Sequence, residues 1–483
     1  MPLTRRAAIT VATALAALAT GACSSGPDSA GPALPGDAVV APAASAIAPG
    51  APAAHAAPAA GADWPTYHGD NARTGFSAGT PRLGTLATAW ATHLDGAVYA
   101  SPVVVAGTAV VATENDSVYG LDAATGTIRW RQHLATPAPL SALPCGNVDP
   151  LGITGTPAYD AVTGRVFVVT TRLAGRRLAH ELVGLDPRTG AVRLRRGADP
   201  AGQDPTVQNQ RGALAVSRGV VYVPYGGHAG DCGDYHGTVV GLRADGKGSL
   251  SSYRVPTHRE AGIWAPSGVA VDARGGLYVA VGNGAAGQDA GQRDAAYDQS
   301  DSVTKLSAAL RRTSVFAPPG WRQENSVDAD LGSTGPLLIG SYVWAQGKAS
   351  TGYVLHQDRQ GGIGGAVSSV HACDRQFGGA AAHGMTVFAS CTDGVRQVLI
   401  SPSGRAVAGW RAPAQVSGSP VVGGDAVFSL DPDAGVLYAL DERSGRVRSQ
   451  LPVGPVTRFA TPALTGGLLL VPTRSGVSAV AGA

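Results

Sequence analysis

The sequence is poor in charge and especially in lysine. Charged residues make up 15% of its 483 residues, the formal net charge is +3, and the only lysines are Lys247, Lys305 and Lys348. No basic stripe with interleaved aromatic side chains is present. Nucleic-acid binding is therefore not expected. Long stretches with helical periodicity are also missing, which argues against a helical fold.

Turn-forming residues are abundant instead, with 67 glycines and 33 prolines. They separate short segments that are rich in β-branched side chains, as expected for strands joined by tight turns. In the first unit of this kind, four strands are predicted at residues 101–105, 109–113, 118–121 and 127–130. Four short antiparallel strands form a sheet that cannot bury both of its faces alone. The unit is therefore expected to stack with copies of itself around an axis.

The unit does recur, in degenerate form. Asp122, Thr125 and Gly126 form the turn between its last two strands, and Trp130 follows. An Asp carboxylate can bond to turn backbone, and Gly accepts a positive φ. The Asp and Gly spacing returns at residues 186–190 and 441–445, without the Trp. This repeat predicts an all-β fold, a β-propeller.

The spacing of Asp122, Thr125, Gly126 and Trp130 resembles the tryptophan-docking motif of pyrrolo-quinoline quinone (PQQ) repeat propellers, which implies that Trp130 packs between neighbouring blades. Other segments resemble a bacterial exported lipoprotein branch of these quinoprotein alcohol dehydrogenase-like proteins: residues 63–76, 220–237, 262–264, 277–284 and 328–336. The resemblance covers nearly everything after residue 62. It is specific for fold rather than activity, because the relatives include both an eight-bladed lipoprotein of outer-membrane protein assembly and PQQ-dependent alcohol dehydrogenases.

Residues 63–483 are long enough for eight four-stranded blades of about 40–50 residues, and seven blades are also possible. We place the blades at residues 98–131, 153–193, 212–255, 267–316, 332–357, 377–411, 417–451 and 459–479. The last of these lacks an outer strand. Residues 86–93 have strand character and include Trp90. They are predicted to supply that strand, so that N- and C-terminal segments close the ring.

The start of the chain predicts export. Residues 1–23 contain Arg5 and Arg6 before an apolar run that is too short to span a membrane. Cys23 is a candidate for lipidation, the alternative being an ordinary cleaved signal, and both Sec and twin-arginine routes stay open. Residues 24–62 are rich in Ala, Pro and Gly and predict a disordered tether. We expect an extracytoplasmic protein, secreted or held at the cell membrane by a lipid anchor only.

Four further cysteines predict two disulfides in such a compartment. Cys145, Cys232, Cys373 and Cys391 allow three connectivities. In a propeller, the loops between blades share a face with the loops between second and third strands, and this places all four cysteines on one face. The pairs that lie closest by blade are Cys145–Cys232 and Cys373–Cys391, which is the connectivity that we predict.

The long loops share that face, at residues 132–152, 226–237, 284–301 and 317–330, so a ligand or partner is expected there or at the channel mouth. Three groups of polar residues stand out: His228, Asp231, Cys232, Asp234 and His236 as a zinc set; Asp289, Asp294, Asp298 and Asp301 as a calcium set; and Asp328 with Asp330 as a carboxylate pair on one side of a strand. For the first two groups we favour the structural alternative of a solvated or backbone-bonded loop, and for Asp328 and Asp330 that of turn and strand-edge structure.

A PQQ dehydrogenase of the resembling family would show adjacent cysteines, a calcium set and an Asp base, and no such motif can be assigned. We therefore predict a non-catalytic binding or protein-interaction scaffold at the bacterial cell envelope, with no catalytic, cofactor or metal residues. Its partners would be other envelope proteins or a small ligand on the loop-rich face. One alternative is a PQQ-dependent alcohol or sugar oxidoreductase with calcium, whose carboxylates and Asn would converge on the channel beside a Trp, with Trp264 as the first candidate; Asn283 fits a turn as well as a site. The other is an extracytoplasmic ligand- or carbohydrate-binding protein.

Overall fold

The computed structural model describes residues 63–175 and 177–482. The predicted signal, the candidate lipidation residue Cys23 and the predicted tether lie outside the described residues. Within the described ranges, no helix is long and apolar enough to cross a membrane.

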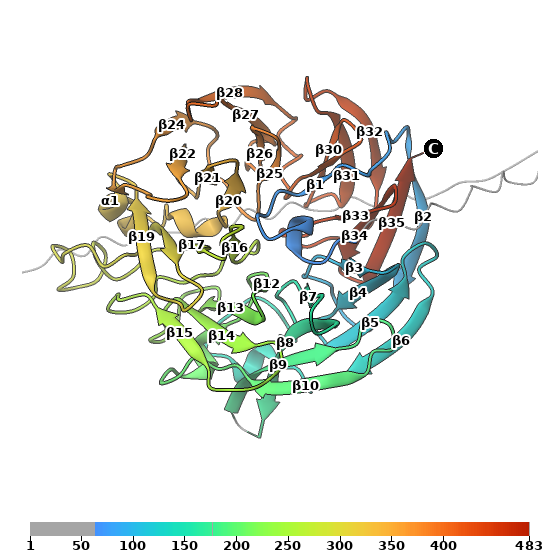
Figure 1. Ribbon diagram of the computed structural model, residues 1–483, viewed down its shortest axis with the longest axis horizontal. Helices are drawn as coiled ribbons and strands as arrows, with labels where there is room; N and C mark the ends of the chain where they lie inside the picture. The colour runs from blue at the N-terminus through green and yellow to red at the C-terminus, as the bar shows by residue number, and fades with distance from the viewer. Residues whose placement is uncertain (1–62, 176, 483) are drawn as a thin grey trace, which may run out of the picture. The chain divides into compact units, whose positions relative to one another are not determined.

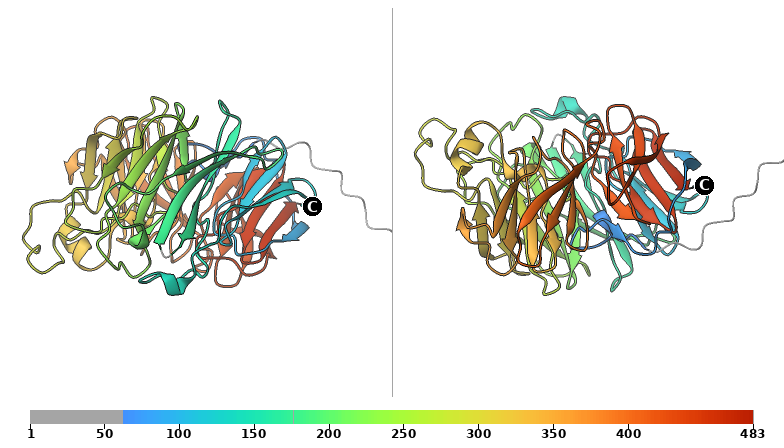
Figure 2. Two further views of the ribbon diagram at one scale, coloured as in Figure 1. Left: turned by 90° about the horizontal axis from the view of Figure 1, so that it is seen from below. Right: turned by 90° about the horizontal axis from the view of Figure 1, so that it is seen from above.

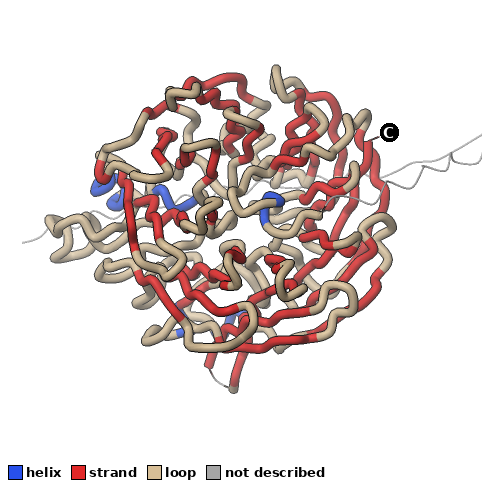
Figure 3. The backbone as a smooth tube through the Cα atoms, in the orientation of Figure 1, coloured by secondary structure: helices blue, strands red, loops and turns tan. Residues whose placement is uncertain are grey.

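Eight sheets of four antiparallel strands surround a common centre, which confirms the predicted eight-bladed β-propeller (Figure 1). Strands and loops make up nearly all of this unit (Figure 3), and the sheets stand side by side around the ring when it is viewed edge-on (Figure 2). The first strand of each blade lies nearest the centre, and the fourth lies on the rim (Figure 1).

The first four blades follow one another along the chain. Their strands are β3 (Val103–Val105), β4 (Thr108–Ala112), β5 (Ser117–Asp122) and β6 (Ile128–His133); β7 (Ala158–Asp160), β8 (Arg165–Ala174), β9 (Arg177–Leu185) and β10 (Val192–Gly197); β12 (Ala215–Ser217), β13 (Val220–Gly227), β14 (Thr238–Arg243) and β15 (Ser251–Arg254); β16 (Ala270–Val271), β17 (Leu277–Val281), β18 (Ser302–Leu306) and β19 (Arg312–Ala317).

The other four blades complete the ring. Their strands are β20 (Leu337–Ile339), β21 (Tyr342–Ala345), β22 (Thr351–His356) and β24 (Ser368–His371); β25 (Ala381–His383), β26 (Thr386–Ala389), β27 (Arg396–Ile400) and β28 (Ala406–Arg411); β29 (Val421–Gly423), β30 (Ala426–Asp431), β31 (Val436–Asp441) and β32 (Val447–Pro452); β33 (Ala463–Thr465), β34 (Leu468–Thr473), β35 (Gly476–Gly482) and β2 (Leu86–His93).

Short elements extend some blades or lie in the loops. The extra strands are β1 (Phe76–Ser77), which is parallel to β29, β11 (Gln208–Asn209), which pairs with β13, and β23 (Gly362–Ile363), which is parallel to β19. The helical turns are η1 (Tyr67–Gly69), η2 (Leu140–Ala142), η3 (Pro205–Val207), α1 (Trp321–Ser326) and η4 (Leu331–Ser333).

Burial follows the position of a strand in its blade. All three residues of the inner strand β3 are buried, as expected for a strand covered on both faces, whereas the rim strand β10 is exposed at alternate positions. Apolar side chains from facing sheets form the core between blades. The largest buried cluster joins the first, seventh and eighth blades.

The ring is closed by a strand from the beginning of the chain, as predicted. β2 pairs antiparallel with β35, from Leu86 opposite Gly482 to His93 opposite Gly476, and the two strands lie together in Figure 1. This pairing covers the outer edge of the last blade, which would otherwise present unpaired backbone groups.

Tryptophans lock three of the junctions between neighbouring blades. Trp130 donates its Nε1–H to the carbonyl of Pro187 at 3.0 Å, and a Cβ on Gly190 would lie 2.5 Å from its ring. The predicted packing of Trp130 between blades is therefore present. Trp90 covers Gly126 and Trp410 covers Gly445 in the same way. Only glycine leaves room for the ring at these turns.

The turn that receives Trp90 is shaped by the motif residues. The Oδ1 atom of Asp122 accepts hydrogen bonds from the backbone N–H groups of Ala124 and Thr125, each at 3.0 Å. Gly126 then adopts a φ of 73°, which glycine tolerates without strain. The motif thus supplies both the turn and the flat surface on which the next ring packs.

A segment before β2 contacts all eight blades at the centre. Its backbone or side chains bond to one residue on or beside the inner strand of each blade: Val104, Tyr159, Val216, Val271, Leu338, Ala382, Val422 and Thr461. These partners are reached from Trp64, Pro65, Tyr67, Asn71, Ala72, Thr74 and Gly75. We call residues 64–75 the central plug; its helical turn η1 lies near the middle of Figure 1.

Two predicted blade boundaries are wrong. The fifth blade was placed at residues 332–357, but its fourth strand is β24. A glycine-rich loop intervenes, in which β23 pairs with β19 of the preceding blade, and this loop hid the strand pattern. The second blade extends to Gly197 rather than to residue 193, because β10 continues along β9 as far as Glu181.

Candidate functional site

The long connections lie on the face where the inner strands begin. In an antiparallel blade, the end of the second strand and the end of the fourth strand both lie beside the start of the first. The connections β6–β7, β13–β14, β17–β18 and β19–β20 therefore share one face, as the sequence predicted. The Asp-containing turns lie on the other face.

Two disulfides fix this face. Cys145 pairs with Cys232, with their Cα atoms 6.1 Å apart, and this bond joins the β6–β7 loop to the β13–β14 loop. Cys373 pairs with Cys391, with a Cα–Cα distance of 5.8 Å. Both pairs are the predicted ones.

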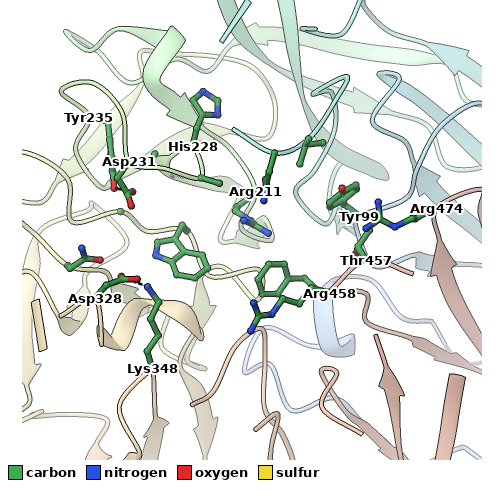
Figure 4. Close-up of a pocket in the computed structure, with 18 residues that line it drawn as sticks. Tyr99, Arg211, His228, Asp231, Tyr235, Asp328, Lys348, Thr457, Arg458 and Arg474 are labelled. Carbon is green, nitrogen blue, oxygen red and sulfur yellow. Dashed lines mark hydrogen bonds and ion pairs between the residues drawn. The ribbon is translucent and has the colours of Figure 1, made fainter. Parts of the chain in front are cut away.

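A cavity of about 370 Å³ opens at the centre of the loop-rich face (Figure 4). Its wall is formed by residues that precede inner strands, such as Tyr99, Arg211, Trp264 and Phe459, and by loop residues such as Lys348. Different blades contribute each of them, so the cavity exists only in the closed ring.

The central plug lies across the channel beneath this cavity. Its contacts fall within or just before the inner strands, further along each strand than the cavity residues. The side chain of Arg73 is buried there and donates hydrogen bonds to the carbonyls of Leu214 and Val269 at 2.9 and 2.7 Å. The cavity is therefore a well that is entered from the loop-rich face.

Arg211 is the central cation of the well. Its guanidinium carbon lies 4.6 Å from the ring centroid of Phe459 and 5.8 Å from that of Trp264. Among the described residues it has no ion-pair partner, and its buried Nε atom has no hydrogen-bond partner. Burial lowers the pKa of Arg211 to about 10, so the group stays charged at neutral pH and can receive an anion.

Three more cations line the well. Figure 4 shows Lys348, Arg458 and Arg474 around Arg211. The Nζ atom of Lys348 lies 5.5 Å from the ring centroid of Trp264. The guanidinium carbon of Arg458 lies 4.1 Å from the ring centroid of Phe377. Asp328 and Asp330 balance the Lys348 charge, whereas Arg211 and Arg458 lie over aromatic rings, which position a positive charge without neutralising it. Together with Arg474, these two arginines give the well an excess of positive charge.

A buried hydroxyl adds to these cations. Thr457 is 2% exposed and lines the well, and its Oγ1 atom has no hydrogen-bond partner. Buried hydroxyls normally have a partner. An oxygen atom of a bound molecule would satisfy this group, and the amide of Asn283 also lines the wall.

The predicted zinc set does not converge on one point. His228 is buried and its Nε2 atom lies 3.2 Å from the carbonyl of Thr206, while burial lowers its pKa to about 4. Asp231 accepts a hydrogen bond from the Tyr235 hydroxyl at 2.6 Å. Cys232 is in a disulfide. These contacts agree with the structural alternative of a stapled loop.

The predicted calcium set is divided among separate partners. Asp289 forms a two-pronged ion pair with Arg259, with both distances 2.6 Å. Asp298 accepts hydrogen bonds from Thr257 and Ser300, Asp301 is buried against the backbone N–H of Leu331, and Asp294 is exposed. Across the described chain, the one compact group of three metal-type residues is Cys373, Cys391 and Asp393, and its sulfurs form a disulfide.

Asp328 and Asp330 lie in a loop and not on a strand, which agrees with the structural alternative of a turn. Asp328 has a φ of 53°, and Asp330 precedes η4 in a loop. Both carboxylates nevertheless contact the Lys348 amine, at 2.9 Å for Asp330. Asp330 is completely buried. Burial raises its pKa, and the Lys348 charge opposes that rise.

The sequence named Trp264 as the candidate Trp of a channel site and left Asn283 open between a turn and a site, and both residues line the well. Sequence reasoning missed Arg211, Lys348, Arg458 and Arg474. The scarcity of lysine was a usable signal for Lys348, because a rare side chain within a buried ion pair is seldom incidental. No local pattern marks the arginines: Arg211 precedes the first strand of the third blade, whereas Arg458 and Arg474 belong to the eighth.

Comparisons with known proteins agree with the propeller fold. The family model described as outer membrane protein assembly factor BamB matches residues 83–362. No curated protein matches the chain.

Similar solved structures include two enzymes and one assembly protein. Quinohemoprotein alcohol dehydrogenase from Comamonas testosteroni is 17% identical, with 86% of this chain and 80% of that chain covered and a TM-score of 0.61. A europium-containing methanol dehydrogenase is 15% identical, with 86% of this chain and 90% of that chain covered and a TM-score of 0.65. BamB from Moraxella catarrhalis is 17% identical, with 82% of this chain and 97% of that chain covered and a TM-score of 0.52.

At these identities the solved structures show a shared fold alone. The family model, however, covers more than half of the sequence. The chain therefore belongs to the family of PQQ-like β-propellers, through the repeat model described as outer membrane protein assembly factor BamB.

Proposed function

We propose that this protein is a non-catalytic binding protein of the cell envelope, which binds a small anionic molecule in the well of its propeller. The observation that carries the proposal is Arg211, a charged guanidinium between two aromatic rings with no ion-pair partner among the described residues. Partial removal of such a charge from water is costly, and Arg211 is half-buried. An anionic ligand would offset that cost.

The cofactor of the related dehydrogenases fits this site only in part. PQQ is a flat molecule with three carboxylates, and the rings and cations of the well suit such an anion. Calcium needs a group of oxygen ligands. The carboxylates at the wall are already used, since Asp231 binds Tyr235, and Asp328 and Asp330 bind Lys348. The site therefore does not fit PQQ with calcium, and we assign it no redox step.

The binding of defined anions tests the proposal. Isothermal titration of the full chain with benzoate, benzene-1,3,5-tricarboxylate and PQQ, each without metal, should show binding of at least one of them. Arg211→Met should weaken that binding roughly ten- to hundred-fold, which corresponds to the loss of one charge-assisted hydrogen bond. Arg405→Met serves as the control, because Arg405 is exposed and lies outside the well.

The outcomes separate a binding role from a structural role for Arg211. Because Arg211 is half-buried and makes no ion pair among the described residues, Arg211→Met should leave the melting temperature nearly unchanged. Wild-type affinity in Arg211→Met, or no binding of any of the three anions, would refute the proposed function.

A protein-interaction scaffold is the second candidate, and the description of the matching family model as an assembly factor favours it. A photo-cross-linker tests it at Val327, which is 57% exposed beside α1 on the loop-rich face. Val162, which is 88% exposed in the β7–β8 turn, is the matched position on the other face. A discrete cross-linked envelope protein at position 327 alone would support a scaffold. Equal labelling at both positions would contradict it.

The envelope location rests on residues 1–23 and is part of the same proposal. Lipidation at Cys23 predicts that Cys23→Ser moves the protein from the membrane fraction to the soluble or secreted fraction. Retention of Cys23→Ser on the membrane would exclude a lipid anchor at this residue.

A further inference from the structure

A second cavity of about 360 Å³ adjoins the well. Four residues line both cavities: Tyr99, Asn147, Val148 and Arg474. The second cavity lies between the segment that precedes β3, the β4–β5 turn and the β6–β7 loop. A molecule bound at Arg211 therefore has room to extend past Tyr99 into this space.

The charge of the second cavity is opposite to that of the well. Asp95, Glu114 and Asp149 line it, and the cations there are limited to Arg474 among the residues that the structure describes. Asp95 is already bonded to Asn115, Ser117 and other neighbours. This leaves Glu114 as the buried carboxylate that can receive a new partner.

Glu114 is held in place with one oxygen unused. The residue is 2% exposed, and its Oε2 atom accepts hydrogen bonds from the backbone N–H of Gly152 at 2.8 Å and from the Thr154 hydroxyl at 3.1 Å. Its Oε1 atom has no hydrogen-bond partner. A buried acceptor without a partner is costly, and a ligand donor would remove that cost.

We propose that Glu114 binds the ammonium group of the same ligand whose anionic group binds Arg211, so that the ligand is a small zwitterion of the amino-acid type. This inference rests on the proposed function, because it places the anion in the well. In this arrangement the carboxylate lies between Arg211 and Arg474, and the ammonium group lies beyond Tyr99.

A metal ion would be a poorer occupant than an ammonium group. Glu114 does not belong to any compact set of three metal-type side chains in the described residues, and an ion held by one carboxylate would keep most of its water. An ammonium group needs only a few acceptors. The hydroxyl of Tyr99, which is hydrogen-bonded to Arg474, belongs to the wall that both cavities share, and Glu114 lines the second cavity alone.

A series of ω-amino acids tests the inference with the full chain. Titrations with glycine, 4-aminobutanoate and 6-aminohexanoate are compared with titrations of the matched carboxylates acetate, butanoate and hexanoate. The assay is run at pH 8, because burial raises the pKa of Glu114 to about 7. For at least one chain length, the amino acid should bind at least about ten-fold more tightly than its carboxylate.

Glu114→Gln should reduce this ratio to about one and leave carboxylate affinity unchanged, while the control Glu442→Gln, on the opposite face, should change neither. N-Acetyl-6-aminohexanoate, which lacks the positive charge, gives the same comparison in the unmodified protein if Glu114→Gln does not fold. Three results would overturn the inference and leave the proposed function standing. They are an unchanged ratio of affinities in Glu114→Gln, full affinity for the acetylated probe, and carboxylate binding that an added amine does not strengthen. Failure of both the amino acids and the carboxylates to bind would overturn the inference, and the proposed function would fail with it only if benzoate, benzene-1,3,5-tricarboxylate and PQQ also did not bind.

Discussion

Replacement of Asp116 by Asn should change how the stability of the protein depends on pH. Asp116 is completely buried in the β4–β5 turn, two residues from Glu114. Burial raises its pKa to about 9, and the Glu114 and Glu181 charges act in the same direction, whereas the backbone N–H of Thr171 and the Arg172 charge oppose the rise. The folded protein therefore holds a neutral acid where the unfolded chain holds a carboxylate.

The sign and size of the effect follow from proton linkage. Between the ordinary Asp pKa of 3.8 and the folded value of about 9, the folded state binds one proton more than the unfolded state. Its free energy of unfolding is therefore greatest at low pH and falls as pH rises through this window. Each pH unit costs about 1.4 kcal/mol, so from pH 5 to pH 8 the wild type should lose about 4 kcal/mol relative to Asp116→Asn.

Urea denaturation of the two proteins, followed by tryptophan fluorescence at several pH values, measures this difference. Asp245→Asn is the control, because the exposed Asp245 has its pKa lowered by Arg243. A lowered pKa stabilises the folded protein above the unfolded value, and this gain is lost in acid. The Asp245→Asn profile should therefore run parallel to that of the wild type from pH 5 to pH 8 and approach it only in acid. Parallel profiles for the wild type and Asp116→Asn between pH 5 and pH 8 would show that Asp116 is ionised in the folded protein, and the reasoning would fail.

Two further predictions concern the ring itself. Gly190→Ala should destabilise the protein by about 1–3 kcal/mol more than Gly164→Ala, because both glycines have a positive φ but only the first faces the Trp130 ring; equal melting temperatures would contradict this packing. Replacing both Cys145 and Cys232 by Ala should cost about 4 kcal/mol, since the bond closes a loop with a sequence separation of 87, and an unchanged urea midpoint would contradict that estimate.

The ring could be predicted from sequence because its features are local. The turn at Asp122 and Gly126 depends on residues that are close together in the chain. The docking of Trp130 on Pro187 and Gly190 of the next blade was implied by the resemblance of this motif to the docking motif of the family. The closure by β2 followed from a missing strand at one end and a spare strand at the other. The fourth strand of the fifth blade was missed because a glycine-rich loop separates β22 from β24.

The site was less accessible to sequence reasoning because its contacts are long-range. Arg211 is positioned by Phe459 and Trp264, and Lys348 by Asp328 and Asp330. None of these pairings is set by a turn or a repeat. The conspicuous clusters of His and Asp were instead bonded to their own neighbourhoods. The charged and aromatic residues of the well come together only in the closed ring, because different blades contribute them.

The central plug has a consequence for the order of folding. Residues 64–75 are synthesised before any blade, yet their last partner, Thr461, is synthesised almost at the end of the chain. While the chain is being synthesised, these residues, including Arg73, lack the hydrogen-bond partners that later blades supply. Contacts between such distant parts of a chain form slowly. The ring should therefore lock in one late step, when a segment that has been free throughout synthesis meets its eighth blade.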